Sequence, residues 1–253
     1  MRAIVLGSGS KGNSTLIINN EEKLLIDVGF SYPKMKMLLE EFNCNPLDIE
    51  GILITHTHKD HIIGLSSFVK KNHTKVYVNE KLFQEISKII PEENLMIVDN
   101  DFSINSFSIN VFKTSHDSEG SVGFIVNNLD KSLVYVTDTG YLNNNVLKLL
   151  INKNAYIFES NHDVEMLMEG PYPYILKQRV LSDKGHLSNE LAGTYLKDLI
   201  GLNTKKVVLA HLSEVNNLPD IAFKTTKALI GDKFDNIELL IAKQNEPIDI
   251  GEI

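Results

Sequence analysis

Three histidines and an aspartate occur close together in residues 55–61, which read T-H-T-H-K-D-H. The apolar run before them, residues 51–54, predicts a buried strand, and the apolar residues after them indicate the start of a helix. His and Asp side chains are seldom buried without partners. Neutral imidazole and carboxylate oxygen are ligands that zinc and related ions prefer. The stretch therefore predicts a metal site at a strand-to-helix junction.

Length and composition describe an ordinary globular chain. Its 253 residues are enough for one large domain, and no linker, repeat or low-complexity segment divides them. The hydrophobic share is 43%, and no apolar run reaches the roughly 18 residues of a membrane span. The N-terminal apolar run is too short for a signal peptide, and the single cysteine, Cys44, is typical of a reducing compartment. We expect one domain over residues 1–253, in the cytoplasm, with no membrane partner.

The net charge of −8 argues against a protein that coats nucleic acid through overall positive charge. It does not exclude a nuclease, because bound divalent ions would supply positive charge where a phosphate lies.

Hydrophobic periodicity predicts strands first, and strands alternating with helices afterwards. Two sheets packed together with helices outside would bury both sheets, so we expect an α/β fold of four layers, α/β/β/α. Helices are predicted at residues 32–42, 60–71, 80–90, 143–151, 191–200 and 220–230. Strands are predicted at residues 3–6, 14–19, 23–26, 51–54, 75–78, 95–98, 122–126, 133–136, 155–158, 206–209, 238–241 and 247–250, with two more within 102–113.

A glycine-rich loop, residues 7–13, satisfies the pattern G-x-G-x-x-G. In dinucleotide-binding proteins a helix follows this pattern directly, whereas residues 14–19 are rich in β-branched side chains and predict a strand. We therefore reject a dinucleotide site. The loop is either a hairpin-like turn or a place where backbone and Ser10 approach a phosphate, and the sequence leaves both open.

Histidines recur at the predicted strand ends. Seven of the eight lie at a strand end or in a loop beside a carboxylate, hydroxyl or glycine, and the exception, His73, lies in a polar surface turn. Any one loop histidine would more often be a surface residue than a ligand, but the recurrence predicts convergence on one rim of the sheets. The candidate metal ligands are His56, His58, Asp60, His61, His116, Asp138 and His211.

These motifs, in this order, resemble those of the metallo-β-lactamase fold: Asp27 after a strand, T-H-x-H-x-D-H, His116, Asp138 in T-D-T-G and His211 in A-H-L-S. Residues 7–13, 159–163, 170–173 and 176–189 further resemble the bacterial YycJ (WalJ, VicX) branch, which is related to RNase Z and RNase J.

The resemblance implies two divalent metal ions. One would be held by His56, His58 and His116, the other by Asp60, His61 and His211. Asp138 would bridge them, and Asp27 would orient a ligand imidazole from behind. Such ligands accept zinc, manganese or iron. Two ions about 3.5–4 Å apart can hold a hydroxide that attacks a phosphodiester.

Further candidates come from residues 159–189. His186, in a G-H-L-S loop similar to that of RNase Z-type nucleases, is predicted to serve the leaving group, with Glu159 orienting it; we count both, with Asp60, as catalytic. His162 is expected to contact substrate or approach a metal. The alternative for these residues is a polar network that braces the loop. Lys177, Arg179 and Lys184, which flank His186, are predicted with Ser10 to bind phosphate. The alternative for the three basic residues is a solvated face, which is what three charges on a helix more often form.

The branch implies a 5′-to-3′ exonuclease on double-stranded DNA. Residues 139–210 leave no room for the inserted domain of RNase J, and no RNase Z-type arm is evident, so DNA is favoured over RNA. A small-molecule phosphodiesterase or a glyoxalase-type thioesterase would share every metal ligand. A non-catalytic regulatory partner of a signalling system would be expected to lose ligands. The sequence makes no prediction of oligomeric state.

Overall fold

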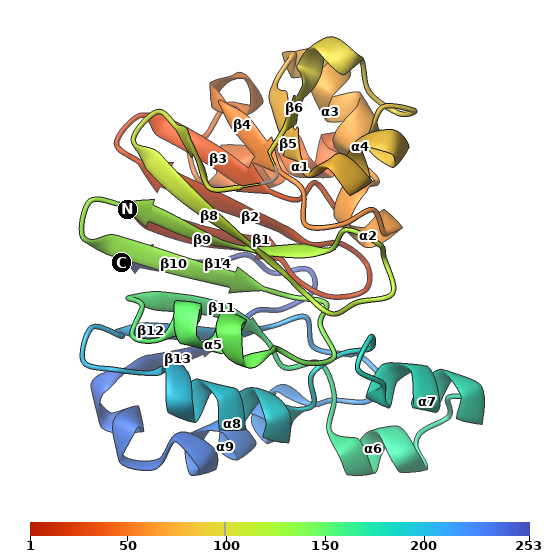
Figure 1. Ribbon diagram of the computed structural model, residues 1–253, viewed down its shortest axis with the longest axis vertical. Coiled ribbons are helices and arrows are strands. Elements are labelled where there is room, and N and C mark those ends of the chain that lie inside the picture. Colours follow the sequence, from red (N-terminus) through yellow and green to blue (C-terminus); the bar gives the residue numbers. More distant parts are fainter. Residues whose placement is uncertain (99) are drawn as a thin grey trace.

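A computed structural model describes residues 1–98 and 100–253 and contains two seven-stranded sheets packed face to face (Figure 1). The first sheet has the order β14 (Ile248–Glu252), β1 (Arg2–Gly7), β2 (Ser14–Asn19), β3 (Glu22–Ile26), β4 (Gly51–Leu53), β5 (Lys75–Val78) and β6 (Leu95–Ile97). The second has the order β13 (Glu238–Ile241), β12 (Lys206–Ala210), β11 (Ala155–Glu159), β10 (Lys131–Val136), β9 (Val122–Asn128), β8 (Phe107–Lys113) and β7 (Phe102–Ile104).

The two sheets share one pattern of strand directions. In the first sheet, β14 to β3 pair antiparallel and β3 to β6 pair parallel. In the second, β7 to β10 pair antiparallel and β10 to β13 pair parallel. Because parallel strands place their carboxyl ends at one edge, the polar segments after β3, β4, β10, β11 and β12 gather at the same edge of the fold.

Alternation along the strands explains the layers. In β1, Ile4 and Leu6 join the core under the helices of the first sheet, whereas Ala3 and Val5 face the second sheet. Side chains from both sheets form the central core, including Tyr135 of β10. The expected four-layer α/β/β/α architecture is confirmed.

Helices cover the outer face of each sheet (Figure 1). The first sheet is covered by α1 (Tyr32–Glu41), α3 (Leu65–Asn72) and α4 (Glu80–Ile86), the second by α5 (Asn144–Leu150), α8 (Asn189–Leu199) and α9 (Pro219–Ile230). Two short helices, α6 (Val164–Glu169) and α7 (Tyr174–Leu181), lie to one side of the sheets, and no residue of α7 is buried. None of the helices in the described part of the chain has the length and apolarity needed to cross a membrane.

The structure corrects several predicted elements. The helix predicted at residues 60–71 is two helices, α2 (Lys59–Ile62) and α3. Between them, Gly64 N donates to Val28 O and not to a helical carbonyl, and a side chain larger than that of glycine would meet Phe30 O. The helix predicted at residues 80–90 ends at Ile86, and α6 was not predicted. Lys184 lies in a turn beyond the end of α7, and not on a helix.

The glycine-rich loop is confirmed as a connection between two strands, β1 and β2. Its backbone N–H groups are used internally: Gly9 donates to the side chain of Asn13 at 2.8 Å, and Lys11 donates to Gln244 at 2.8 Å. These donors are therefore not free to bind a phosphate. Elsewhere in the fold, Cys44 is buried, and burial raises the pKa of its thiol to about 11.

Candidate metal centre

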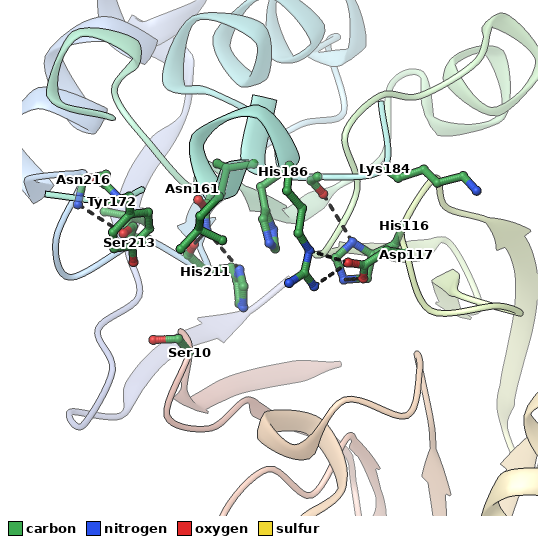
Figure 2. Close-up of a pocket in the computed structure, with 15 residues that line it drawn as sticks. Ser10, His116, Asp117, Asn161, Tyr172, Lys184, His186, His211, Ser213 and Asn216 are labelled. Carbon is green, nitrogen blue, oxygen red and sulfur yellow. Dashed lines mark hydrogen bonds and ion pairs between the residues drawn. The ribbon is translucent and has the colours of Figure 1, made fainter. Parts of the chain in front are cut away.

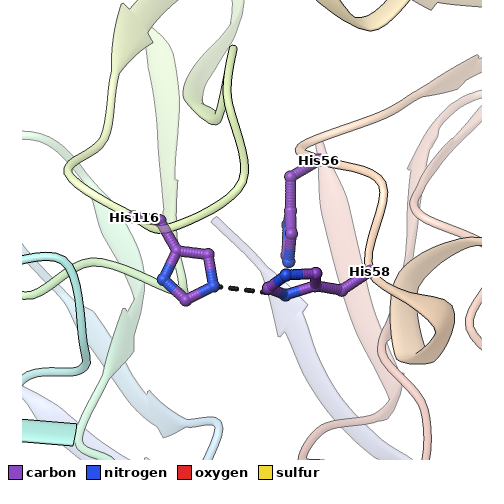
Figure 3. Close-up of side chains that lie close together, drawn as sticks. All are labelled: His56, His58 and His116. Carbon is purple, nitrogen blue, oxygen red and sulfur yellow. Dashed lines mark hydrogen bonds between the residues drawn. The ribbon is translucent and has the colours of Figure 1, made fainter. Parts of the chain in front are cut away.

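The seven candidate ligands meet at the edge where the parallel strands end. His56 and His58 follow β4, and Asp60 and His61 belong to α2; His116 follows β8, Asp138 follows β10 and His211 follows β12. Potential ligand atoms of His56, His58 and His116 lie within 4.8 Å of one another (Figure 3), as do those of Asp60, His61 and His211. Asp138 forms a third such group with His56 and His61.

Distances between these atoms suit tetrahedral metal coordination. Two ligands about 2.0–2.1 Å from a tetrahedral ion are separated by roughly 3.3–3.4 Å. His58 Nδ1 lies 3.3 Å from His116 Nε2. His61 Nε2 lies 3.4 Å from Asp60 Oδ2 and 3.2 Å from Asp138 Oδ2. His211 Nε2 lies 3.5 Å from Asp138 Oδ1. Asp138 Oδ1 also lies 3.8 Å from Nε2 of His116, so Asp138 faces ligands of both triads.

Most of the imidazoles are held through Nδ1, which directs Nε2 into the centre. The Nδ1 atoms of His56, His61 and His116 contact Thr55 Oγ1 at 3.0 Å, Asp27 Oδ2 at 2.7 Å and the carbonyl of Gly185 at 3.2 Å. That arrangement is usual for ligand histidines, whose second nitrogen is fixed by an outer partner.

Three buried atoms in the centre have no hydrogen-bond partner among the described residues: His56 Nε2, His211 Nε2 and Asp138 Oδ2. An unpaired buried polar atom is costly, so such atoms call for a partner. A divalent cation would satisfy all three, and the residues present fit a metal.

Asp27 is fully buried behind His61. Its carboxylate also accepts hydrogen bonds from Thr55 N at 2.9 Å and Thr55 Oγ1 at 2.8 Å. Burial raises the pKa of Asp27, although the neighbouring His61 opposes this shift. The geometry agrees with the orienting role that the resemblance implies for Asp27.

The pKa values of the candidate ligand histidines are shifted in opposite directions in the protein without metal. Burial lowers the pKa of His61 and His211, but Asp138 and the other carboxylates around them outweigh burial. The net effect raises the pKa of His61 above its usual range and that of His211 to about 10. Burial and the positive charge of His61 lower the pKa of His56. A metal must therefore displace protons from His61 and His211 at neutral pH.

Three residues of the centre adopt left-handed backbone conformations. The φ angles are 60° at Asp27, 57° at Asp138 and 56° at His211. Non-glycine residues rarely have positive φ, and such conformations concentrate at functional sites. Each of the three lies within two residues of a strand end, where the turn redirects its side chain toward the centre.

His186 lies beside the centre and lines a cavity of about 190 Å³ (Figure 2). Its Nδ1 is 2.7 Å from Glu159 Oε1, and the same oxygen is 3.3 Å from Nδ1 of His211. Glu159 is fully buried and also accepts hydrogen bonds from the backbone N–H groups of Thr139 and Leu187. Burial raises the pKa of Glu159, but His186 and His211 outweigh it, and the net pKa is low. One carboxylate thus holds both a candidate metal ligand and a histidine of the cavity.

Not every predicted substrate residue reaches the cavity. Ser10, Arg179 and Lys184 line it. Lys177 does not, and its ammonium donates to the carbonyl of Met168. His162 is buried away from the lining, and neither ring nitrogen has a hydrogen-bond partner among the described residues. Burial lowers the pKa of His162 to about 4, so its ring is neutral at neutral pH.

Three residues of the site were missed in the sequence. Asn13 Nδ2 lies 3.2 Å from Asp60 Oδ2, and Asn161 Nδ2 donates to the carbonyl of His211 at 2.9 Å. Asp117 accepts a hydrogen bond from Arg179 at 2.7 Å and lines the cavity. Burial raises the pKa of Asp117, but His116 and Arg179 outweigh it and lower the net value. Asp117 directly follows a predicted ligand, and the two asparagines lie in segments 7–13 and 159–163, which resemble the YycJ branch; both were usable signals.

Comparisons with known proteins agree with this geometry. The family model "Metallo-beta-lactamase superfamily" matches residues 7–211. The chain is 37% identical to exodeoxyribonuclease YycJ of Bacillus anthracis over 90% of this chain and 89% of that protein. It is 39% identical to exodeoxyribonuclease WalJ of Streptococcus pneumoniae over 87% of this chain and 85% of that protein.

The crystal structure of YhfI from Bacillus subtilis, a metallo-beta-lactamase fold protein, covers 98% of both chains with a TM-score of 0.75 at 18% identity, which supports the fold alone. The superfamily match and the His and Asp clusters together indicate a site for divalent metal. The chain therefore belongs to the metallo-beta-lactamase superfamily, in the group that contains YycJ of B. anthracis and WalJ of S. pneumoniae.

Proposed function

We propose that the protein is a metal-dependent exonuclease that degrades double-stranded DNA from the 5′ end, and that it acts in the cytoplasm as a single domain. The observation that carries the proposal is the His186–Glu159 pair, which places a histidine outside the ligand triads beside the metal centre and in the cavity wall. Support for a DNA substrate comes from the names of the two relatives, YycJ and WalJ, which match most of the chain.

Two divalent ions, zinc or manganese with iron as a further candidate, would be held by the two histidine-rich triads, with Asp138 between them. Metal bound there would activate water at neutral pH and neutralise a phosphoryl oxygen.

The protein's own residues supply the remaining chemistry. His186 Nδ1 is engaged by Glu159, which leaves Nε2 to donate a proton to the departing oxygen of a phosphodiester. The N–H groups of Thr139 and Leu187 fix the Glu159 carboxylate, so that it orients the ring of His186. Arg179 and Lys184, which line the same cavity, would bind backbone phosphate.

The test is a panel of end-labelled substrates. Purified protein with Mn²⁺ is incubated with single- and double-stranded DNA carrying a label at either end, with RNA, and with a chromogenic phosphodiester. We expect mononucleotides to be released from the 5′ end of double-stranded DNA. Activity on the chromogenic ester alone would overturn the nuclease proposal in favour of a small-molecule phosphodiesterase, and activity on a thioester would favour a glyoxalase-type hydrolase. Metal binding without any hydrolysis would favour the regulatory partner.

A further inference from the structure

The guanidinium of Arg179 is held by a carboxylate of the protein itself. Arg179 Nε donates to Asp117 Oδ2 at 2.7 Å, and Nη2 contacts the same oxygen. The other oxygen of Asp117, Oδ1, lies 3.4 Å from Nε2 of both His58 and His116. One carboxylate therefore stands between a cation of the cavity and two candidate metal ligands (Figure 2 shows Asp117 beside His116).

Asp117 also lies at the junction of two hollows. The cavity of about 190 Å³ and a neighbouring groove of about 790 Å³ share His116, Asp117 and Lys184 in their linings. A substrate that extends from the groove into the cavity must therefore pass the pair formed by Asp117 and Arg179.

The pair suits exchange of partners. Guanidinium binds carboxylate and phosphate oxygens in the same forked geometry. The Arg179 side chain is 59% exposed and that of Asp117 is 27% exposed, and exposed ion pairs contribute little to stability. An incoming phosphate can therefore replace the carboxylate at a small cost in free energy, whereas a neutral ligand supplies no anion to pair with Arg179.

We propose that Asp117 is an internal stand-in for a substrate phosphate, which occupies Arg179 until a backbone phosphate of nucleic acid takes its place. Asp117 thereby determines specificity, because a ligand must carry an anion that competes with it. This inference rests on the proposed nuclease function and adds to it a residue that sets the threshold for binding.

The test measures binding without turnover. Metal-loaded protein is titrated against a fluorescent, phosphorothioate-linked DNA duplex that resists hydrolysis, and anisotropy gives the dissociation constant. Asp117→Asn keeps the shape of the side chain and removes its charge. We expect it to bind the duplex about three- to fivefold more tightly than the wild type, the range that an exposed ion pair allows.

Asp130→Asn is the matched control. Asp130 pairs with Lys131 and lines neither hollow, so its replacement changes the net charge equally but leaves Arg179 engaged; we expect less than twofold tightening. Arg179→Ala should weaken binding, and adding Asp117→Asn to it should then give no tightening. Equal affinity of Asp117→Asn and wild type, equal tightening in the control, or tightening that persists without Arg179 would each refute the proposal.

Two further measurements separate this inference from the proposed function. Metal content, measured on each variant, should be unchanged in Asp117→Asn, and its loss would instead make Asp117 a metal ligand. Inorganic phosphate, titrated by calorimetry, should also bind Asp117→Asn more tightly. Tighter phosphate binding with no DNA binding by any form would sink the nuclease proposal and leave the stand-in role intact.

Discussion

Glu159 contacts two histidines to which we assign different tasks. Its Oε1 is 2.7 Å from Nδ1 of His186 and 3.3 Å from Nδ1 of His211. The ring planes of these histidines are inclined by 23° with centroids 5.3 Å apart. At the scale of single residues, the candidate metal ligand and the candidate proton donor are thus fixed by the same carboxylate, and substitutions can separate their tasks.

Replacing Asp138 and His186 separates metal binding from proton transfer. Asp138→Ala removes the carboxylate that faces both triads, so we expect loss of bound metal and of hydrolysis. His186→Ala should retain metal and lose about 10²–10⁴-fold in hydrolysis, the usual contribution of a positioned acid. Elemental analysis and hydrolysis of labelled DNA are measured on both variants. Loss of metal in His186→Ala would contradict the role assigned to that histidine.

Asp27→Asn should weaken metal binding without removing a ligand. Asp27 accepts the Nδ1 proton of His61 at 2.7 Å. An amide group facing Nδ1 would favour the other tautomer, with the proton on Nε2, and a protonated Nε2 cannot bind metal. We expect an affinity about 10–100-fold lower, as for other outer partners of ligand histidines.

Competition with a chromogenic chelator measures this affinity. Asp48→Asn serves as the control for Asp27→Asn, because Asp48 is a carboxylate 45% exposed at the N-terminal turn of a short 3-10 helix. Wild-type affinity in Asp27→Asn would show that Asp27 does not set the tautomer of His61.

At the scale of elements, the predictions of structure were correct where a local sequence pattern alone determines it. The strand-to-helix junction at residues 55–61 and the apolar runs before His116, Asp138 and His211 are local patterns, and the structure gathers all these side chains at one edge. The break between α2 and α3 involves instead a contact with a distant segment: Gly64 N donates to Val28 O, and a Cβ on Gly64 would lie 1.9 Å from Phe30 O. A helical pattern in residues 60–71 cannot reveal that approach.

Contacts between residues far apart in the sequence also explain why some residues of the site could not be predicted. Arg179 reaches Asp117 across 62 positions of the chain, and Asn161 reaches His211 across 50. His162 follows a strand end as the ligands do, yet a parallel bridge to Ser188 holds it in the interior. Position after a strand therefore predicts the edge of the sheet, but the neighbouring segments decide whether a side chain faces the cavity.

Gly64→Ala tests the break between α2 and α3. The new methyl group would meet backbone that cannot move aside, and overpacking costs about 1–3 kcal/mol or more. Since a loss of 1 kcal/mol lowers Tm by roughly 2–4 °C in a chain of this size, we expect a measurable drop. Metal content should fall as well. Gly64 N donates a hydrogen bond to Val28 O, and Val28 N donates one to His61 O, so a shift at residue 64 would displace the ligand His61.

Gly231→Ala is the comparison for Gly64→Ala. Gly231 has a φ of 57° and a ψ of −133°, a sparsely populated conformation, and open space around its Cβ position, so alanine there costs about 1–3 kcal/mol through backbone conformation alone. It should leave metal content unchanged. Full metal occupancy in Gly64→Ala would contradict the idea that the break positions Asp60 and His61.

At the scale of the molecule, the centre joins the two sheets. His56, His58, Asp60 and His61 come from segments of the first sheet, and His116, Asp138 and His211 come from segments of the second. Imidazoles from the first sheet thereby face a carboxylate from the second, as in the contact of His61 with the buried Asp138. Metal bound there would connect both halves, so its removal should lower the stability of the whole fold.

The effect of metal on stability should depend on pH. Without metal, His61 and His211 have pKa values raised above the unfolded value near 6.5, to about 10 for His211. The stability that these protons contribute is fully present below the unfolded pKa and is lost as the pH rises through the folded pKa. Over the same pH interval the free energy of metal binding becomes more favourable, because fewer protons must be displaced. The gain is up to about 1.4 kcal/mol per proton and pH unit.

We therefore expect the difference in Tm between metal-loaded and chelated protein to widen from pH 6.5 to 8.5. Thermal unfolding followed by circular dichroism, with and without chelator at matched ionic strength, measures it. His73→Gln is a control that changes an exposed histidine outside the centre, and it should leave the slope unaltered. A gap that stays constant or narrows with rising pH would show that protons on His61 and His211 do not compete with metal.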